Sequence, residues 1–305
     1  MNIKNLLLLA SAALLSLTAC SSDDAAQGEA PNSGTPILLA GTLEDAATRA
    51  ATNIQNNRFE QSTVVDVHIE VTDKRNDKTT YDILQYQVSD ASGSLTPVKK
   101  VYPYYPVKGT SVNIFGIYPS GYMDAGSFSV QPIQLNKEMY KASDLIFAKV
   151  ENQSAQQAAV TLPFRHLMSK VIVNLTAGDN GEDITNSKVN LLNVATKIAT
   201  PDRGELGEVD ESSRTTVQMS TDGSKSSAAI IVPQEVPSGV LIEVQLANND
   251  IVNYKTTQTM VFESGKKYTF NIKVVEETLV ATYTIDDWTP TTDHEQDIKL
   301  KQQNP

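Results

Sequence analysis

The sequence predicts an all-β protein made of two β-sandwich domains in tandem, with few short helices. Three observations support this fold class. From Thr63 onwards apolar residues alternate with polar ones, many other short apolar runs are separated by glycine and proline turns, and helical periodicity is scarce. Many short strands joined by such turns are typical of β-sandwiches, because each sheet needs a second sheet to cover its apolar face.

The first half of the chain begins with an apolar strand candidate within residues 35–43. The clearest strand follows from Thr63, and its two faces are Val65, Val67, Ile69 and Val71 on one side and Asp66, His68 and Glu70 on the other. This period of two indicates a half-buried antiparallel strand. Further strand candidates are Thr80–Val88, Ser111–Tyr118, Asp144–Val150 and Ala159–Leu162. Prolines confine residues 98–106 to a sheet edge or a loop.

The second half repeats this pattern after Pro163, where we place the domain boundary. The expected domains are residues 35–162 and 163–305, and a chain of 305 residues is long enough for two domains of ordinary size. Strand candidates here are Ser169–Leu175, Lys188–Asn193, Ala228–Val232, Val240–Leu246 and Val280–Ile285. We expect Tyr254–Phe262 and Tyr268–Val275 to form a hairpin across residues 263–266. Modest helical patterns occur only at residues 44–57 and Leu135–Ala142.

Residues 1–19 have the pattern of a signal peptide. Lys4 supplies a positive charge, and the apolar run that ends at Leu17 is too short to span a membrane. Small residues then lead to Cys20, the only cysteine in the chain. The residues Leu17-Thr18-Ala19-Cys20 resemble the lipobox of bacterial lipoproteins, in which the cysteine is acylated and the peptide bond before it is cut. Residues 20–34 are small, polar and acidic, which predicts a disordered tether.

The composition excludes several classes of partner. The formal net charge is −11, which argues against nucleic acid as a ligand and against electrostatic docking on anionic lipid heads. No segment after the signal approaches the roughly twenty apolar residues of a membrane helix. Attachment to a membrane would therefore depend on the lipid at Cys20, and two or more acyl chains hold a protein there stably.

The chain offers no pattern for a catalytic, cofactor or metal site. Its histidines, His68, His166 and His294, are scattered without ligand spacing, and no free cysteine remains for a zinc site or a thiol nucleophile. Residues 179–183 resemble a calcium loop only superficially, because the ligand spacing fails and no bidentate glutamate follows. We therefore expect no catalytic residues, no metal and no cofactor.

Three segments of the sequence are similar to segments of one known family. Residues 162–175 read Leu-Pro-Phe-Arg-His-Leu-Met-Ser-Lys-Val-Ile-Val-Asn-Leu and resemble the motif that opens the family's second domain. Residues 265–274, followed by Ile-Asp-Asp-Trp at 285–288, are similar to its closing hairpin and tryptophan. The third segment is the apolar strand that runs into Thr48-Arg49-Ala50. Together these segments resemble the fimbrillin family of Bacteroidales-type bacteria, whose members are lipoprotein pilins sometimes called type V. The resemblance implies transthyretin-like β-sandwich domains.

The resemblance also implies a mechanism. In the family a trypsin-like protease cuts after an arginine behind the first strand. The corresponding bond here is Arg49–Ala50, with Arg58–Phe59 as a rival. The cut would release the lipid and the first strand, whose apolar residues are Ile37, Leu38, Leu39 and Leu43. The groove would then accept a strand from a neighbouring subunit, and the donor in this chain would be the C-terminal segment that carries Ile298 and Leu300.

The implied partners are other fimbrial subunits in a homo- or heteropolymer, the processing protease, and the outer membrane through Cys20. The implied location is the outer membrane and the fimbrium. His166 and Trp288 are expected to be structural, since one tryptophan does not make a sugar platform. Two alternatives stay open: an uncut anchor subunit or tip adhesin of the same fold, and a glycan-binding surface lipoprotein. An enzyme is not expected.

Overall fold

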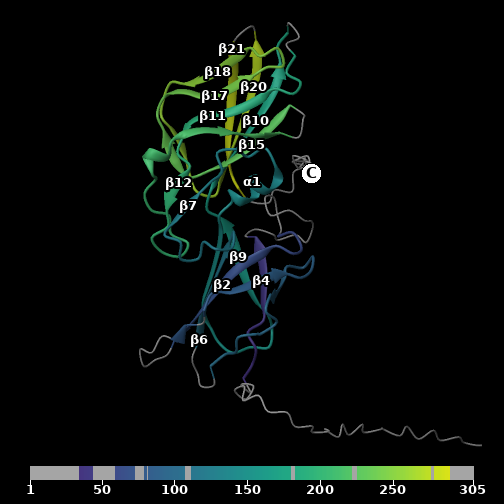
Figure 1. Cartoon of the computed structure of the whole chain (residues 1–305), viewed down its shortest axis with the longest axis vertical. Helices are drawn as coiled ribbons and strands as arrows, with labels where there is room; N and C mark the ends of the chain where they lie inside the picture. Colours follow the sequence, from purple (N-terminus) through teal and green to yellow (C-terminus); the bar gives the residue numbers. More distant parts are fainter. Residues whose placement is uncertain are drawn as a thin grey trace, which may run out of the picture. The chain divides into compact units, whose positions relative to one another are not determined.

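The computed structural model describes residues 34–43, 59–72, 79–80, 82–106, 111–179, 183–221, 225–275 and 278–288. These residues belong to one unit that is compact by its contacts. Their regular secondary structure is almost entirely strands, with one short α-helix and one 3₁₀ turn, so the predicted all-β fold is confirmed (Figure 1). Within the described residues no helix is long and apolar enough to cross a membrane.

The first half of the chain forms an eight-stranded sheet. Its strands are β1 (Leu39–Leu43), β2 (Val64–Thr72), β3 (Thr79–Thr80), β4 (Leu84–Val88), β5 (Ser94–Pro97), β6 (Ser111–Tyr118), β8 (Ile146–Gln153) and β9 (Val160–His166). The order is β3-β2-β4-β5-β1-β9-β8-β6, and β6 pairs in turn with β2. The pairings therefore form a closed circuit, in which β2 uses its first residues for β4 and its later residues for β6.

Strand β2 is more buried than its sequence pattern predicts. Val65, Val67, Ile69 and Val71 lie in the core as expected, but Asp66 and His68 on the opposite face are buried too. Asp66 accepts a hydrogen bond from the backbone N–H of Gly121 (2.6 Å). His68 faces Phe115 at 6.2 Å between ring centroids, and burial, then the charge of Arg203, lowers its pKa below the usual 6.5. The expectation of a half-buried strand was wrong, because this second face is covered as well.

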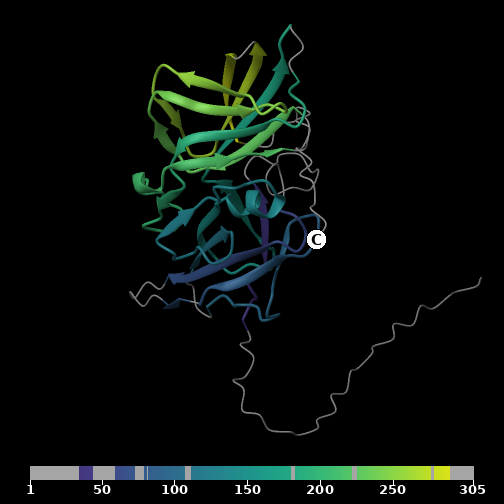
Figure 2. The ribbon, with the colours of Figure 1, turned by 45° about the horizontal axis from the view of Figure 1, so that its top comes forward.

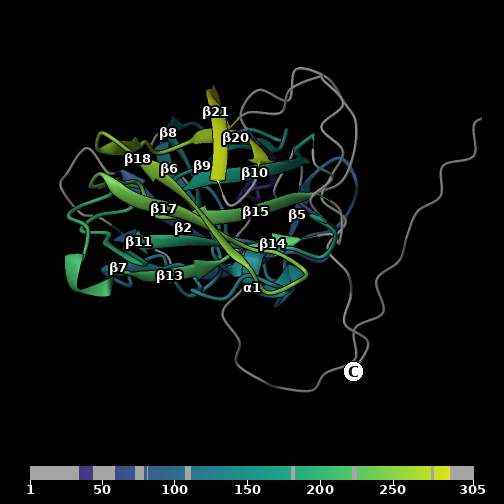
Figure 3. The same ribbon diagram turned by 90° about the horizontal axis from the view of Figure 1, so that it is seen from above.

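The second half contains two sheets that share a core (Figures 2 and 3). The five-stranded sheet has the order β14 (Ser220–Thr221), β15 (Ser226–Ile231), β10 (Ser169–Ala177), β20 (Lys266–Val275) and β21 (Thr278–Asp287). The four-stranded sheet has the order β13 (Thr215–Gln218), β11 (Lys188–Val194), β17 (Gly239–Gln245) and β18 (Ile251–Thr256). One apolar cluster takes side chains from both sheets, including Val173 and Phe270 from the first and Leu191 and Ile242 from the second.

Two small sheets complete the fold. Strand β7 (Ser127–Ser129) pairs with β12 (Lys197–Ala199), and β16 (Gln234–Val236) pairs with β19 (Met260–Phe262). The predicted hairpin across residues 263–266 was wrong. Strand β20 lies between β10 and β21, while β19 pairs with β16. The chain turns between the two pairings at Gly265, whose φ of 69° favours glycine.

The helix predicted at Leu135–Ala142 is present as α1 (Lys137–Ala142). It begins there because the Asn136 side chain caps it, accepting a hydrogen bond from the Met139 N–H at 2.8 Å. The helical pattern at residues 44–57 lies outside the described residues. Residues 98–106 form no extended strand. Among them only Tyr104 makes an isolated bridge, to Pro36. Of the two predicted outcomes, a sheet edge or a loop, the segment therefore forms a loop, because its prolines have no N–H group to donate to a neighbouring strand.

A separate apolar cluster joins residues from both sides of Pro163. Its members include Phe115 and Phe147 from the first half and Ile172, Ile230 and Trp288 from the second. Pro163, where we placed the domain boundary, lies inside β9, so the first sheet extends to His166. The division into two domains stays a prediction.

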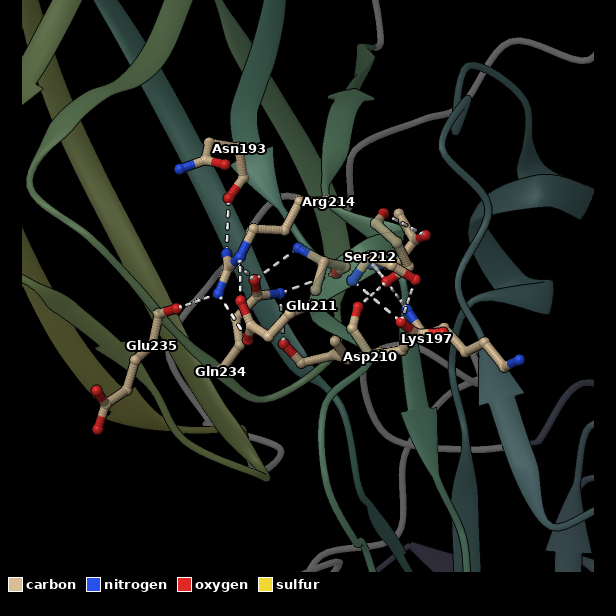
Figure 4. Close-up of polar contacts among 12 residues, drawn as sticks. Asn193, Lys197, Asp210, Glu211, Ser212, Arg214, Gln234 and Glu235 are labelled. Atoms are coloured by element: carbon tan, nitrogen blue, oxygen red, sulfur yellow. Dashed lines mark hydrogen bonds and ion pairs between the residues drawn. The ribbon is translucent and has the colours of Figure 1, made fainter.

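Arg214 joins three segments of the second half (Figure 4). Its guanidinium donates to both carboxylate oxygens of Glu211 (2.6 and 3.0 Å), which belongs to the 3₁₀ turn Glu211–Ser213. It also donates to the Asn193 carbonyl (2.8 Å), the Glu235 carbonyl (2.8 Å) and the Gln234 side-chain oxygen (3.2 Å). All five N–H groups of an arginine are used in these bonds. The residue therefore acts as a structural tie.

Candidate functional site

The candidate site is the strand β1 and the groove that holds it. Strand β1, purple in Figure 1, lies between β5, which is antiparallel to it, and β9, which is parallel. Hydrogen bonds on both sides hold the segment 35–43: the Ile37 N–H donates to Pro103 and the Gly41 N–H to Gly93, while the Val160 N–H donates to Leu38 (each 2.8 Å). An interior strand of this kind cannot leave without exposing backbone groups on two neighbours.

One face of the segment 35–43 points into the core of the first sheet. Ile37 is 0% exposed, and Leu39 and Leu43 are each 3% exposed. Leu38 is only partly buried, because successive side chains of an extended strand point to opposite faces. Of the residues we expected to be displaced, three therefore fill the core and Leu38 does not. Removing the segment would leave a groove with pockets for Ile37, Leu39 and Leu43.

Gly41 is the point of closest packing in β1. A Cβ atom at Gly41 would lie 3.2 Å from the ring of Phe164 in β9. On the backbone side Gly93, with a φ of 86°, approaches so closely that its Cβ would lie 2.2 Å from the Gly41 oxygen. Gly93 needs glycine for lack of space and for its positive φ, whereas at Gly41 a Cβ fits only if Phe164 shifts by a few tenths of an ångström. A glycine inside an apolar strand is a signal of such close approach, but the sequence alone does not show what approaches it.

Phe164 is held on its other sides. A Cβ on Gly116 of β6 would lie 2.6 Å from the tip of the ring, so only glycine leaves room there. The ring of Phe59 meets it edge-on at 4.7 Å between centroids. Phe164 itself is fully buried. The ring therefore has a fixed position beside β1.

The chain is anchored again just after the rival cleavage bond. Phe59 is 6% exposed, and the carboxylate of the next residue, Glu60, pairs with Lys137 (2.9 Å) and Lys141, both from α1. Burial opposes ionisation of Glu60, but the hydrogen bonds and charges of the two lysines outweigh it and lower its pKa. Phe59 and Glu60 are thus fixed to the fold on the C-terminal side of Arg58.

His166 and Trp288 lie together at the end of β9 and the end of β21. Their rings stack at 3.8 Å between centroids with 8° between the planes. His166 Nδ1 lies 2.9 Å from Asp144 Oδ1, and the backbone N–H of Trp288 donates to the Gly265 carbonyl (2.7 Å). Trp288 is 5% exposed, so its ring is not available as a surface platform. Both residues stay predicted as structural, and the contact joins the strand beside β1 to the last described residue of the chain.

The remaining predicted site residues lie outside the described residues: Cys20, Arg49, Ala50, Arg58, Ile298 and Leu300. Among the residues that are described, no group of three or more His, Cys, Asp or Glu side chains is placed to hold a metal. The sequence reasoning missed four residues that shape the groove, which are Gly41, Gly93, Gly116 and Phe164. Their contacts join four different strands or turns, and for this reason they are not visible as a local motif.

Known proteins share the fold of this chain. No curated protein matches the chain. A candidate cell adhesion protein from Bacteroides uniformis has a similar solved structure, with a TM-score of 0.65, 18% identity, and coverage of 83% of this chain and 98% of that one. A second, from Bacteroides ovatus, has a TM-score of 0.64, 21% identity, and coverage of 84% and 98%. At such identities the likeness establishes the fold. The fimbrillin-like family matches residues 48–288, most of the chain, and the chain therefore belongs to the fimbrillin-like family.

Proposed function

We propose that this chain is a structural subunit of a cell-surface fimbria that assembles by strand exchange. It is exported as a lipoprotein on Cys20 and held at the outer membrane by the lipid. A trypsin-like protease then cuts after Arg49 and frees the segment that carries β1. In the fimbrium the C-terminal segment with Ile298 and Leu300 fills the groove of a neighbouring subunit. Membership of the fimbrillin-like family supports the role of a fimbrial subunit.

The observation that carries the exchange step is the place of β1 in the sheet. It is hydrogen-bonded on both sides by β5 and β9, and its inward residues are buried. Loss of an interior strand leaves unpaired backbone groups and an apolar groove, and an extended segment of another chain satisfies both. Contacts of this head-to-tail kind do not close on themselves, so they build a filament.

Contacts made by Phe59 and Glu60 weaken the case for cleavage after Arg58. A protease must bind several residues on each side of the bond in an extended form, which requires an accessible and detachable backbone. Phe59 packs on Phe164 and Glu60 is paired with Lys137 and Lys141, so cleavage after Arg58 would first have to break these contacts. These contacts count against Arg58 and leave Arg49 as the proposed cleavage position.

The test is limited trypsin digestion of the soluble chain, residues 21–305, followed by intact mass and by exchange of the cut strand. An early cut after Arg49 is expected, and a labelled peptide with the sequence of residues 35–43 should then replace the original segment. The variants Arg49→Ala and Arg58→Ala are matched controls, and only the first should abolish the early cut. Resistance at Arg49, or a cut chain that never takes up the peptide, would favour an uncut anchor or tip subunit.

A further inference from the structure

The groove that holds β1 has an uneven floor. Ile37, Leu39 and Leu43 are buried members of the apolar cluster formed by the first sheet, so the groove has room for a large side chain at each of these positions. At Gly41, on the same face and between Leu39 and Leu43, the ring of Phe164 fills the space instead. A strand in this groove therefore has room for a large side chain at the positions of Ile37, Leu39 and Leu43. At the position of Gly41 the groove is closed by Phe164.

The closed position cannot open easily. A Cβ at Gly41 would be 3.2 Å from the Phe164 ring, a distance that a shift of a few tenths of an ångström relieves. A longer side chain needs the Phe164 ring to move. The ring already lies so close to Gly116 that an added Cβ there would be 2.6 Å from its tip, and the ring of Phe59 packs edge-on against it. Close-packed interiors resist such an insertion, because neighbours have no free volume to enter.

We propose, on the basis of the strand exchange above, that Phe164 sets which strands this groove accepts. The accepted strand has large apolar side chains at the positions of Ile37, Leu39 and Leu43, and glycine or alanine at the position of Gly41. Phe164 is thus a specificity-determining residue. The requirement is for a spacing of residue sizes, apolar-x-apolar-x-small-x-apolar, and it does not depend on charge.

The proposed donor segment of this same chain does not meet the requirement. Residues 289–305 contain no glycine, alanine or serine, and their aliphatic residues are only Ile298 and Leu300. No register of this segment places a small residue between large apolar ones two positions away on either side. The groove is therefore filled by a strand from a different subunit, while the segment 289–305 enters a differently shaped groove. Cut copies of this chain alone do not form a filament.

The experiment measures binding of labelled peptides to the trypsin-cut chain by fluorescence anisotropy. The peptides are residues 35–43 unaltered, the same with Gly41→Ala, the same with Gly41→Leu, and residues 289–301. The first two should bind alike, and the Gly41→Leu peptide at least about tenfold more weakly. The 289–301 peptide should not compete. A cut chain with Phe164→Ala should accept the Gly41→Leu peptide as well as the unaltered one.

Three results would overturn the proposal: equal binding of the Gly41→Leu peptide, tight binding of the 289–301 peptide, or filaments from the cut chain alone. The last two would still support strand exchange itself. Failure of the unaltered peptide would instead refute strand exchange. In that case the uncut chain still tests the requirement for a small residue at position 41. Gly41→Leu should lower the urea midpoint of the otherwise unchanged chain, but it should not lower the midpoint of the Phe164→Ala variant further. Additive losses would contradict the role of Phe164.

Discussion

Shortening Leu39 separates the contribution of the buried face of β1 from that of its backbone. Leu39 pairs with Leu95 and Val160 and is a buried member of the apolar cluster formed by the first sheet. Replacing a buried leucine by alanine removes the transfer free energy of the lost methyl groups and leaves a cavity, a cost of about 3 kcal/mol. Leu38→Ala is a matched control, since the same change is made one residue away on the partly buried face. It should cost less than about 1 kcal/mol.

The same difference should appear in the cut chain. Before the cut, Leu39→Ala lowers the free energy of unfolding, which urea denaturation followed by circular dichroism measures. After the cut, the covalent link is gone, and a loss of about 3 kcal/mol weakens retention of the strand about 100-fold. Exchange with the labelled 35–43 peptide reports this change. Equal effects of Leu39→Ala and Leu38→Ala would refute the assignment of the two faces.

Three further substitutions test other parts of the fold. Glu60→Gln should cost about 1 kcal/mol at pH 7; because the folded pKa lies below 4.5, the cost should disappear as pH falls through that lower value, in urea titrations. Below pH 6.5 the unfolded chain protonates His68 more readily than the folded chain, so the free energy of unfolding should fall by up to about 1.4 kcal/mol per pH unit. His68→Gln should remove this pH dependence. The same slope in the variant would contradict the burial of His68. Arg214→Lys should lower the free energy of unfolding by about 2 kcal/mol, because lysine cannot reach the carbonyls of Asn193 and Glu235 together. A variant as stable as the original chain would show that the guanidinium group is not needed.

Local patterns predicted most of the strands. Alternation identified β2, and the weak helical pattern at Leu135–Ala142 coincides with α1. The errors came where tertiary contacts decide the outcome. The hairpin expected at residues 263–266 did not form, because a strand pattern gives the existence of β20 but not its partners, β10 and β21. Likewise the polar face of β2 is covered by residues that are distant in sequence, such as Gly121 and Arg203.

By itself the sequence determined the all-β class, the apolar segment at residues 35–43 and the absence of a pattern for catalysis. These properties depend on residue type and spacing within short windows, which the sequence states directly. Only the tertiary structure decided that this segment is an interior strand, that Leu38 faces away from the core, and that Phe164 closes the groove at Gly41. Such contacts join β1, β6 and β9 across more than a hundred residues, and the space between side chains exists only after the sheet has closed.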